Sequence, residues 1–139
     1  MGTEISIGAI VFKKSNPIRF SVLKRADKGI WDFAKGHRQE QETEIHTLHR
    51  ELQEEIGITN FSIIPNFKKE ISYISSRGVK RVMVFYLVYV DKEICISSEH
   101  SKFKWISLSE APDYFPYNDI IELLKKCEER INTHLNEMI

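Results

Sequence analysis

The sequence is poor in cysteine and has no excess of either charge. Only two cysteines, Cys95 and Cys127, occur among 139 residues, far apart and in apolar surroundings. This spacing excludes a dense disulfide framework and a zinc site built on paired cysteines, so we expect two buried thiols in a reducing cytoplasm. Lysine plus arginine and aspartate plus glutamate each number 20. A total charge of zero gives no support to generic capture of nucleic acid or membrane, so any anion site must be local.

Long apolar runs are also absent. No run approaches the roughly 20 residues needed to cross a bilayer, and no signal peptide precedes the first strand-like segment. Hydrophobic residues make up 42% and charged residues 29% of the chain, which is ordinary for one soluble globular domain. We therefore expect residues 1–139 to form a single monomeric domain in the cytoplasm, without a membrane partner.

Apolar periodicity and turn residues divide the chain into strands and two helices. Strands are expected at residues 4–12, 19–24, 31–33, 61–65, 67–74, 81–90, 94–97 and 103–107, with a loop at 37–41. A helix is expected at 42–56, where Ile45, Leu48, Leu52 and Ile56 recur at spacings of three and four before the capping residue Gly57. A second amphipathic helix is expected at 120–135. This order predicts an α+β fold with a mixed β-sheet.

The end of the first expected helix carries a stripe of acids. Glu51, Glu54 and Glu55 fall on one side of the helix, at the rim of its apolar face. Like charges at these spacings cost about 0.2–0.5 kcal/mol per pair, and acids in a last turn oppose the helix dipole. A bound Mg²⁺ or Mn²⁺ would relieve both conflicts, because hard cations prefer carboxylate oxygens. The alternative interpretation is a solvated acidic helix end.

The residues around this stripe keep a fixed spacing. Gly36 is followed after five residues by Glu42, and after seven more by Arg50-Glu51-Leu52-Gln53-Glu54-Glu55-Ile56-Gly57-Ile58. This spacing resembles the Nudix box, G-x5-E-x7-R-E-U-x-E-E-x-G-U with U aliphatic, at every specified position. The resemblance implies a Nudix-type α/β/α sandwich and magnesium-dependent hydrolysis of nucleoside diphosphates linked to another moiety.

The resemblance also implies roles for the matched residues. Glu51, Glu54 and Glu55 correspond to metal ligands, and Gly36 lets the backbone approach the metal or the phosphate. Arg50 corresponds to the residue that orients Glu51 through a charge-assisted hydrogen bond.

Three further segments are similar to the asymmetric diadenosine tetraphosphate hydrolases within this family. They are Trp31-Asp32-Phe33-Ala34-Lys35-Gly36-His37, Phe67-Lys68-Lys69-Glu70-Ile71-Ser72-Tyr73 and Ser98-Glu99-His100-Ser101-Lys102-Phe103-Lys104-Trp105. The similarity implies cleavage of diadenosine tetraphosphate, a small-molecule substrate, to ATP and AMP. One departure is Ala34, where these enzymes usually have proline.

Candidate residues outside the helix follow from the chemistry of phosphoanhydride cleavage, which needs positive charge on the phosphate oxygens. We expect Lys35, His37 and Lys80 to contact phosphates, although Lys80 could equally be a solvated charge at a strand end. Glu99 resembles the family's additional metal-ligand or base carboxylate, while its neighbours His100 and Lys102 could be merely solvated. Either Glu51 or Glu99 could serve as the base, and we favour Glu51.

Adenine needs aromatic surfaces for stacking. Tyr73 matches the family's stacking tyrosine, and Tyr117 is a second candidate that could instead anchor the last helix.

Two other functions compete with this prediction. One is an RNA 5′-end or nucleoside triphosphate pyrophosphohydrolase, whose RNA version is disfavoured by the zero net charge, so no stable nucleic-acid partner is expected. The other is a non-catalytic nucleotide-binding Nudix module. Such a module is expected to have lost box carboxylates, whereas Glu42, Glu51, Glu54 and Glu55 are all present.

Overall fold

Seven strands, two α-helices and a 3₁₀ helix make up the computed structural model, which describes residues 2–137. The strands are β1 (Thr3–Lys13), β2 (Arg19–Arg25), β3 (Trp31–Asp32), β4 (Ala34–His37), β5 (Ser62–Ile74), β6 (Lys80–Tyr89) and β7 (His100–Ile106). The helices are α1 (Glu44–Ile56), η1 (Leu108–Asp113) and α2 (Asn118–Glu137).

The sheet is mixed, as the sequence predicts. Its order is β3-β2-β1-β6-β5, with β4 paired to β1 and β7 paired to β2. Strands β1 and β6 are parallel, and the other pairs are antiparallel. Strands β1 and β2 pair only at Phe12↔Phe20 and Lys13↔Arg19. The two strands then separate, which leaves β1 free to pair with β4 and β2 free to pair with β7.

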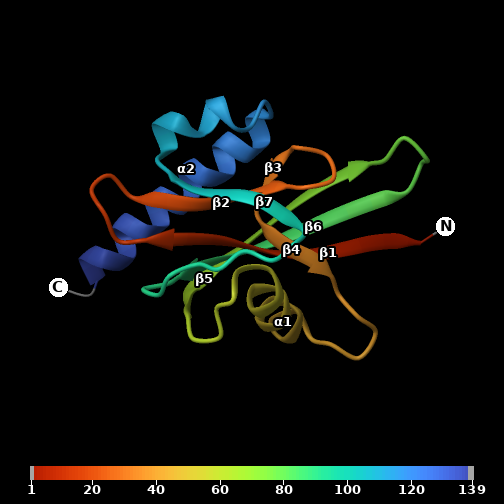
Figure 1. Ribbon diagram of the computed structural model, residues 1–139, viewed down its shortest axis with the longest axis horizontal. Helices are drawn as coiled ribbons and strands as arrows, with labels where there is room; N and C mark the ends of the chain where they lie inside the picture. Colours follow the sequence, from red (N-terminus) through yellow and green to blue (C-terminus); the bar gives the residue numbers. More distant parts are fainter. Residues whose placement is uncertain (1, 138–139) are drawn as a thin grey trace.

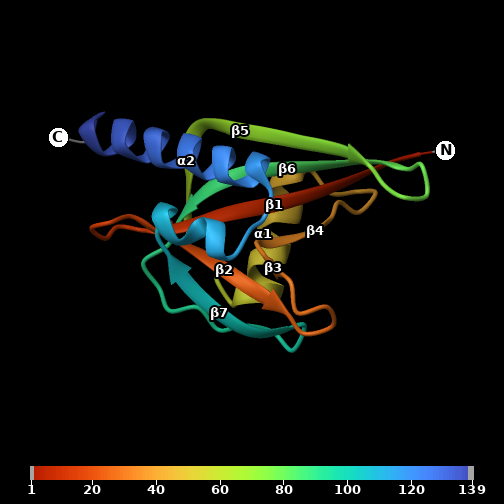
Figure 2. The same cartoon turned by 90° about the horizontal axis from the view of Figure 1, so that it is seen from above.

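Two apolar cores lie on opposite faces of the sheet because strand β1 buries both of its faces. Ile7, Ala9 and Val11 pack in one core with α1, whereas Ile10 and Phe12 pack in the other with α2. Figures 1 and 2 show α1 and α2 on opposite sides of the strands. This layering is the α/β/α sandwich that the sequence predicts.

Several boundaries differ from the sequence-based expectations. The segments 61–65 and 67–74 form one strand, β5, interrupted by a register shift between Ile63 and Lys68 and by a positive φ of 59° at Asn66. Helix α1 begins at Glu44 rather than at residue 42, because the Thr43 side chain accepts a hydrogen bond from the His46 amide. Residue 37, expected in a loop, ends strand β4.

The expected strand at 94–97 is wrong. This segment caps the end of α1 instead: the amide of Cys95 donates to the carbonyl of Ile56, and the amide of Ser97 donates to that of Glu55, each at 3.0 Å. Cys95 is exposed, contrary to expectation, whereas Cys127 is buried in the α2 core as expected. No helix within residues 2–137 is long and apolar enough to cross a membrane.

Candidate active site

Gly36 brings strand β4 against helix α1. It pairs with Ile7 on β1, and a Cβ atom on it would lie 2.0 Å from Oε1 of Glu51. Any side chain here would displace the Glu51 carboxylate. The backbone at Gly36 therefore lies close to the side chain of Glu51, one of the predicted metal ligands.

Arg50 fixes the acids around it. Its guanidinium lies 2.6 Å from Glu42 Oε2, 2.7 Å from Glu51 Oε1 and 3.3 Å from Glu54 Oε2, and it also donates to the His37 carbonyl. The hydrogen bonds from Arg50 lower the pKa of Glu42 to about 2. The predicted hydrogen bond between Arg50 and Glu51 is thus present, and Glu42 anchors Arg50 from the other side.

Glu55 is the most deeply placed of the three acids on α1. Glu55 is 6% exposed, and its Oε2 atom is buried without a hydrogen-bond partner among the described residues. Burial, together with the negative charge of Glu51, raises the pKa of Glu55 to about 9. Burial also raises the pKa of Glu51, although Arg50 opposes this shift. Glu54 keeps the exposed rim position, with 58% of its side chain accessible.

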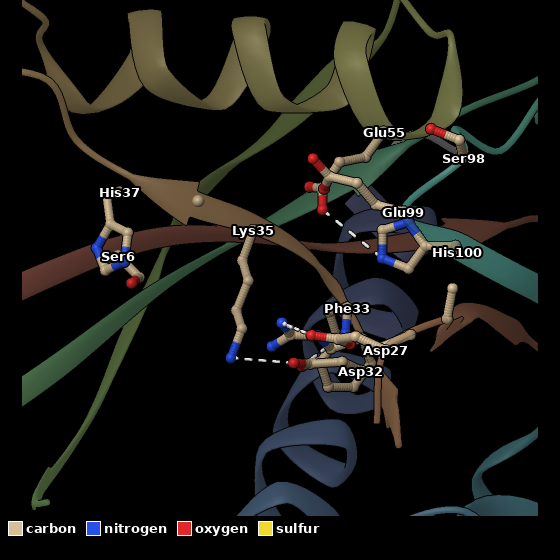
Figure 3. Close-up of a pocket in the computed structure, with 13 residues that line it drawn as sticks. Ser6, Asp27, Asp32, Phe33, Lys35, His37, Glu55, Ser98, Glu99 and His100 are labelled. Carbon is tan, nitrogen blue, oxygen red and sulfur yellow. Dashed lines mark hydrogen bonds and ion pairs between the residues drawn. The ribbon is translucent and has the colours of Figure 1, made fainter. Parts of the chain in front are cut away.

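Beside Glu55 opens a cleft of about 660 Å³, which we call the carboxylate cleft. Figure 3 shows Glu55, Glu99 and His100 gathered on one side of it, while Lys35 extends toward Asp32. Its lining residues are Ser6, Arg25, Ala26, Asp27, Asp32, Phe33, Lys35, Gly36, His37, Glu55, Ser98, Glu99 and His100.

Backbone hydrogen bonds hold Glu99 at this cleft. The amide of Ala26, just after β2, donates to the carbonyl of Glu99 at 2.9 Å. The same segment is attached to α1 through the bond from Ser97 to Glu55. Glu99 is therefore placed between β2 and α1, although it is 44 positions beyond Glu55 in the chain.

His100 corrects the sequence-based interpretation, which treated it as solvated. It is 8% exposed, and its Nε2 atom lies 3.7 Å from Oε1 of Glu55. Burial lowers its pKa, so the neutral imidazole is favoured. Spacing within the sequence does not reveal this contact, because it joins β7 to α1.

A second cleft of about 500 Å³ adjoins the first, and we call it the aromatic cleft. It is lined by Ile30, Trp31, Asp32, Lys35, Ile71, Tyr73, Met83, Phe115, Tyr117, Asp119 and Ile120. Tyr73 is 45% exposed and Tyr117 is 63% exposed. The structure thus brings both candidate stacking residues to one cleft.

Asp32 and Lys35 line both clefts. The Lys35 ammonium lies 3.0 Å from Asp32 Oδ2 and donates to the Met83 sulfur at 3.4 Å. Sequence reasoning missed Asp32, because its importance depends on where the two clefts meet.

Lys80 does not join the other candidates. It is exposed at the start of β6, opposite Ile74, and lines neither cleft. Figure 1 shows this hairpin between β5 and β6 at the end of the sheet where β1 begins, away from both helices. The placement agrees with the alternative of a solvated charge at a strand end.

The donor set fits a divalent cation. Within residues 2–137, no three histidine, cysteine or acidic side chains already converge in a metal-binding arrangement. However, the partly buried Glu51 and the buried Glu55 place neighbouring carboxylates together, and Glu55 Oε2 has no partner in the described structure. Hard oxygen donors of this kind match Mg²⁺ or Mn²⁺, and a bound cation would favour the ionised form of both carboxylates.

Similarity to known proteins agrees with this geometry. A curated relative from Sus scrofa, "Bis(5'-nucleosyl)-tetraphosphatase [asymmetrical]", is 32% identical over 133 residues, covering 86% of this chain and 89% of its own. An "RNA pyrophosphohydrolase" from Campylobacter jejuni is 28% identical over 144 residues, covering 90% and 92%.

A solved structure supports the fold. The C. elegans Ap4A hydrolase binary complex matches with a TM-score of 0.79 at 21% identity, covering 96% of this chain and 98% of that chain. The family model for the NUDIX domain matches residues 2–125, which include the whole sheet, α1 and the start of α2. The chain belongs to the Nudix family.

Proposed function

We propose that the protein hydrolyses dinucleoside polyphosphates asymmetrically in the presence of magnesium, cleaving diadenosine tetraphosphate to ATP and AMP. The observation that carries the proposal is the junction of the two clefts at Asp32 and Lys35. A nucleoside in the aromatic cleft would extend its phosphate chain past Lys35 toward Glu55. The curated relative named above supports the choice of substrate.

The carboxylate cleft provides the residues for the reaction. Glu51 and Glu55 would hold the divalent cation, with Glu54 and Glu99 as further carboxylates and the backbone at Gly36 nearby. When bound, Mg²⁺, or Mn²⁺ in its place, supplies positive charge for the phosphate oxygens and lowers the pKa of water. Arg50 holds Glu51 in place through the 2.7 Å ion pair. Glu51 and Glu99 are both candidate bases, and Glu51 is favoured because Arg50 and Gly36 fix its position.

The remaining residues orient the substrate. Lys35 brings an ammonium group to the phosphate path, and His37 lines the same cleft. Tyr73 and Tyr117 would stack on adenine, since stacking contributes about 1–3 kcal/mol per base. Lys80 is omitted from this role because it lies outside both clefts.

Hydrolysis in oxygen-18 water tests the proposal. The enzyme is incubated with diadenosine tetraphosphate and magnesium, and the products are resolved by chromatography and mass spectrometry. Attack at the fourth phosphate counted from the retained adenosine gives ATP and AMP, with the label in AMP. Two ADP molecules would contradict asymmetric cleavage, and label in ATP would move the attacked phosphorus to the neighbouring position.

The same assay includes ordinary nucleoside triphosphates. Rapid release of pyrophosphate from them, with the dinucleotide untouched, would replace the proposed substrate by nucleoside triphosphates. Tight nucleotide binding without any turnover would instead indicate a binding module.

A further inference from the structure

A methionine sulfur lies beside the lysine that is proposed to contact the phosphates. Met83 on β6 lines the aromatic cleft, and its Sδ atom accepts a hydrogen bond of 3.4 Å from Nζ of Lys35. The same ammonium group lies 3.0 Å from Oδ2 of Asp32, and Figure 3 shows the Lys35 side chain extending in that direction. Within residues 2–137, Met83 is the only methionine. Its position joins the proposed base-binding surface to the phosphate path.

The sheet leaves room for Lys35 to reach this sulfur. Lys35 on β4 pairs with Gly8 on β1, and β1 pairs in turn with β6. A Cβ atom on Gly8 would lie 3.2 Å from Cβ of Lys35 and 2.9 Å from the ring of Phe85, so a side chain there would be crowded. Because glycine leaves this space open, the Lys35 side chain can cross β1 to contact Met83 on β6.

The present partners of Lys35 hold it only weakly. A thioether sulfur is a weak hydrogen-bond acceptor. The ion pair with Asp32 is partly accessible to water, with 27% of the Lys35 side chain and 21% of the Asp32 side chain exposed, and water screens such a pair. Lys35 can therefore exchange these contacts for phosphate oxygens when a substrate binds.

We propose that Met83 is a site of oxidation through which a peroxide slows the proposed hydrolysis. The sulfur lone pair attacks one oxygen of hydrogen peroxide, and the O–O bond breaks. That oxygen remains on the sulfur as a sulfoxide, and the other leaves with both protons as water, so that the sulfur loses two electrons and the peroxide gains them. Met83 is accessible to this small oxidant because it is partly exposed and lines the aromatic cleft.

The added oxygen changes what Lys35 binds. Oxidation makes the side chain of Met83 polar, and the new oxygen is attached to the atom that already lies 3.4 Å from the Lys35 ammonium. Asp32 and the sulfoxide would then engage two of the three ammonium hydrogens and compete with the phosphate chain for them. This inference rests on the proposed phosphate-binding role of Lys35.

The two thiols are less suited to this role. Cys127 is buried in the α2 core, and Cys95 is exposed but lines neither cleft. Dithiothreitol reverses the oxidation of a thiol to a sulfenic acid or a disulfide, whereas a methionine sulfoxide requires methionine sulfoxide reductase. The two kinds of oxidation can therefore be separated by the reductant that reverses them.

Peroxide treatment of matched variants tests the proposal. Wild type, Met83→Leu and the control Met138→Leu are treated with hydrogen peroxide and then with dithiothreitol, and peptide mass spectrometry measures the oxygen taken up at each methionine. Leucine keeps an apolar side chain of similar volume but has no sulfur to oxidise. Hydrolysis of diadenosine tetraphosphate with magnesium is measured before and after treatment, so that each protein is its own reference.

Wild type and Met138→Leu are expected to lose about tenfold in kcat/KM as Met83 is oxidised, because a hydrogen bond to a charged group is weakened. Met83→Leu should keep its own untreated value, and methionine sulfoxide reductase should restore wild type. Lys35→Leu, which introduces no second thioether, tests whether the effect acts through the lysine. Oxidation of Met83 in this variant should lower the remaining kcat/KM by less than about twofold, because the group that the sulfoxide engages is absent.

Four results would overturn the proposal. They are resistance of Met83 to peroxide, unchanged kcat/KM in wild type with Met83 oxidised, equal losses in wild type and Met83→Leu, or an equal loss in wild type and Lys35→Leu.

ATP binding without divalent metal, measured by titration calorimetry, separates this inference from the proposed function. If wild type cleaves the dinucleotide equally well with Met83 reduced or oxidised, the inference fails while the proposed function stands. If wild type does not cleave the dinucleotide, the proposed function fails. About tenfold weaker ATP binding by the oxidised wild type, absent in Met83→Leu, would then still support competition between the sulfoxide and phosphate for Lys35.

Discussion

The two clefts share Asp32 and Lys35 but differ in how firmly their residues are held. In the carboxylate cleft, Glu55 is 6% exposed and backbone hydrogen bonds connect its neighbours to α1 and β2. In the aromatic cleft, Tyr117 is 63% exposed. Buried groups that are hydrogen-bonded to several elements can fix the positions of reacting atoms. Exposed aromatic rings instead contribute binding energy by stacking on a flat ligand such as a base. Changes in the first cleft should therefore lower turnover, and changes in the second should weaken binding.

The largest effect is expected from Glu55→Gln, which keeps the shape of the side chain but removes its ability to become a carboxylate. Turnover should fall about 10²–10³-fold, the scale seen when one preorganised electrostatic group is lost. Weaker Mn²⁺ binding, measured by electron paramagnetic resonance, should accompany this loss.

The fold should survive this change. Because burial raises the pKa of Glu55 to about 9, the metal-free wild type already holds a neutral group here at pH 7. Its melting temperature without metal should therefore match that of the variant. Near-wild-type activity at saturating magnesium would show that the assigned metal site is wrong.

Gly36→Ala is expected to have the next largest effect, although it adds only one methyl group. The added Cβ would lie 2.0 Å from Oε1 of Glu51, so the carboxylate or strand β4 must move. A displacement of about 1 Å can reduce the rate by about 10²-fold. Steady-state kinetics should show a fall in kcat rather than a rise in KM, and unchanged kcat would mean that the position of Glu51 is not critical.

Sequence periodicity could predict α1 because its apolar residues and its end signal agree. Leu48, Leu52 and Ile56 are buried on one side, and Gly57 ends the helix with a φ of 69°. The segment 94–97 has the same apolar character but forms no strand. Its amides instead satisfy the free carbonyls of α1, and this role depends on tertiary contacts that local composition does not record.

The site residues likewise fall into those that the sequence could predict and those that depend on tertiary contacts. The Nudix box spacing identified the acids on α1 and the residue that pairs with them, Arg50. It did not identify His100 or Asp32, since each becomes significant only where distant elements meet. Lys80 is the opposite case: its sequence context allowed either a phosphate contact or a solvated charge, and the hairpin places it outside both clefts.

Tyr73→Ala should affect binding more than rate. Loss of the ring should raise the dissociation constant for the dinucleotide by an amount equivalent to about 1–3 kcal/mol, while Tyr73→Phe should retain stacking.

Lys35→Met is the contrasting change, because loss of positive charge beside the phosphates should lower kcat most. Titration calorimetry and steady-state kinetics separate the two effects. Equal loss of rate with unchanged KM in both variants would argue against a base contact by Tyr73.

The smallest effect is expected from a change at Asp32, where the two clefts meet, and this change should improve substrate binding rather than weaken it. Asp32 attracts Lys35 at 3.0 Å and places a negative charge on the proposed phosphate path. Asp32→Asn removes this competition, and the amide oxygen can still accept the hydrogen bond from the Phe33 amide. A gain of about 0.2–1 kcal/mol, the usual scale of an accessible ion pair, should lower KM for the dinucleotide by up to about fivefold. A raised KM would show instead that Asp32 positions Lys35 productively, so that the ion pair serves binding rather than opposing it.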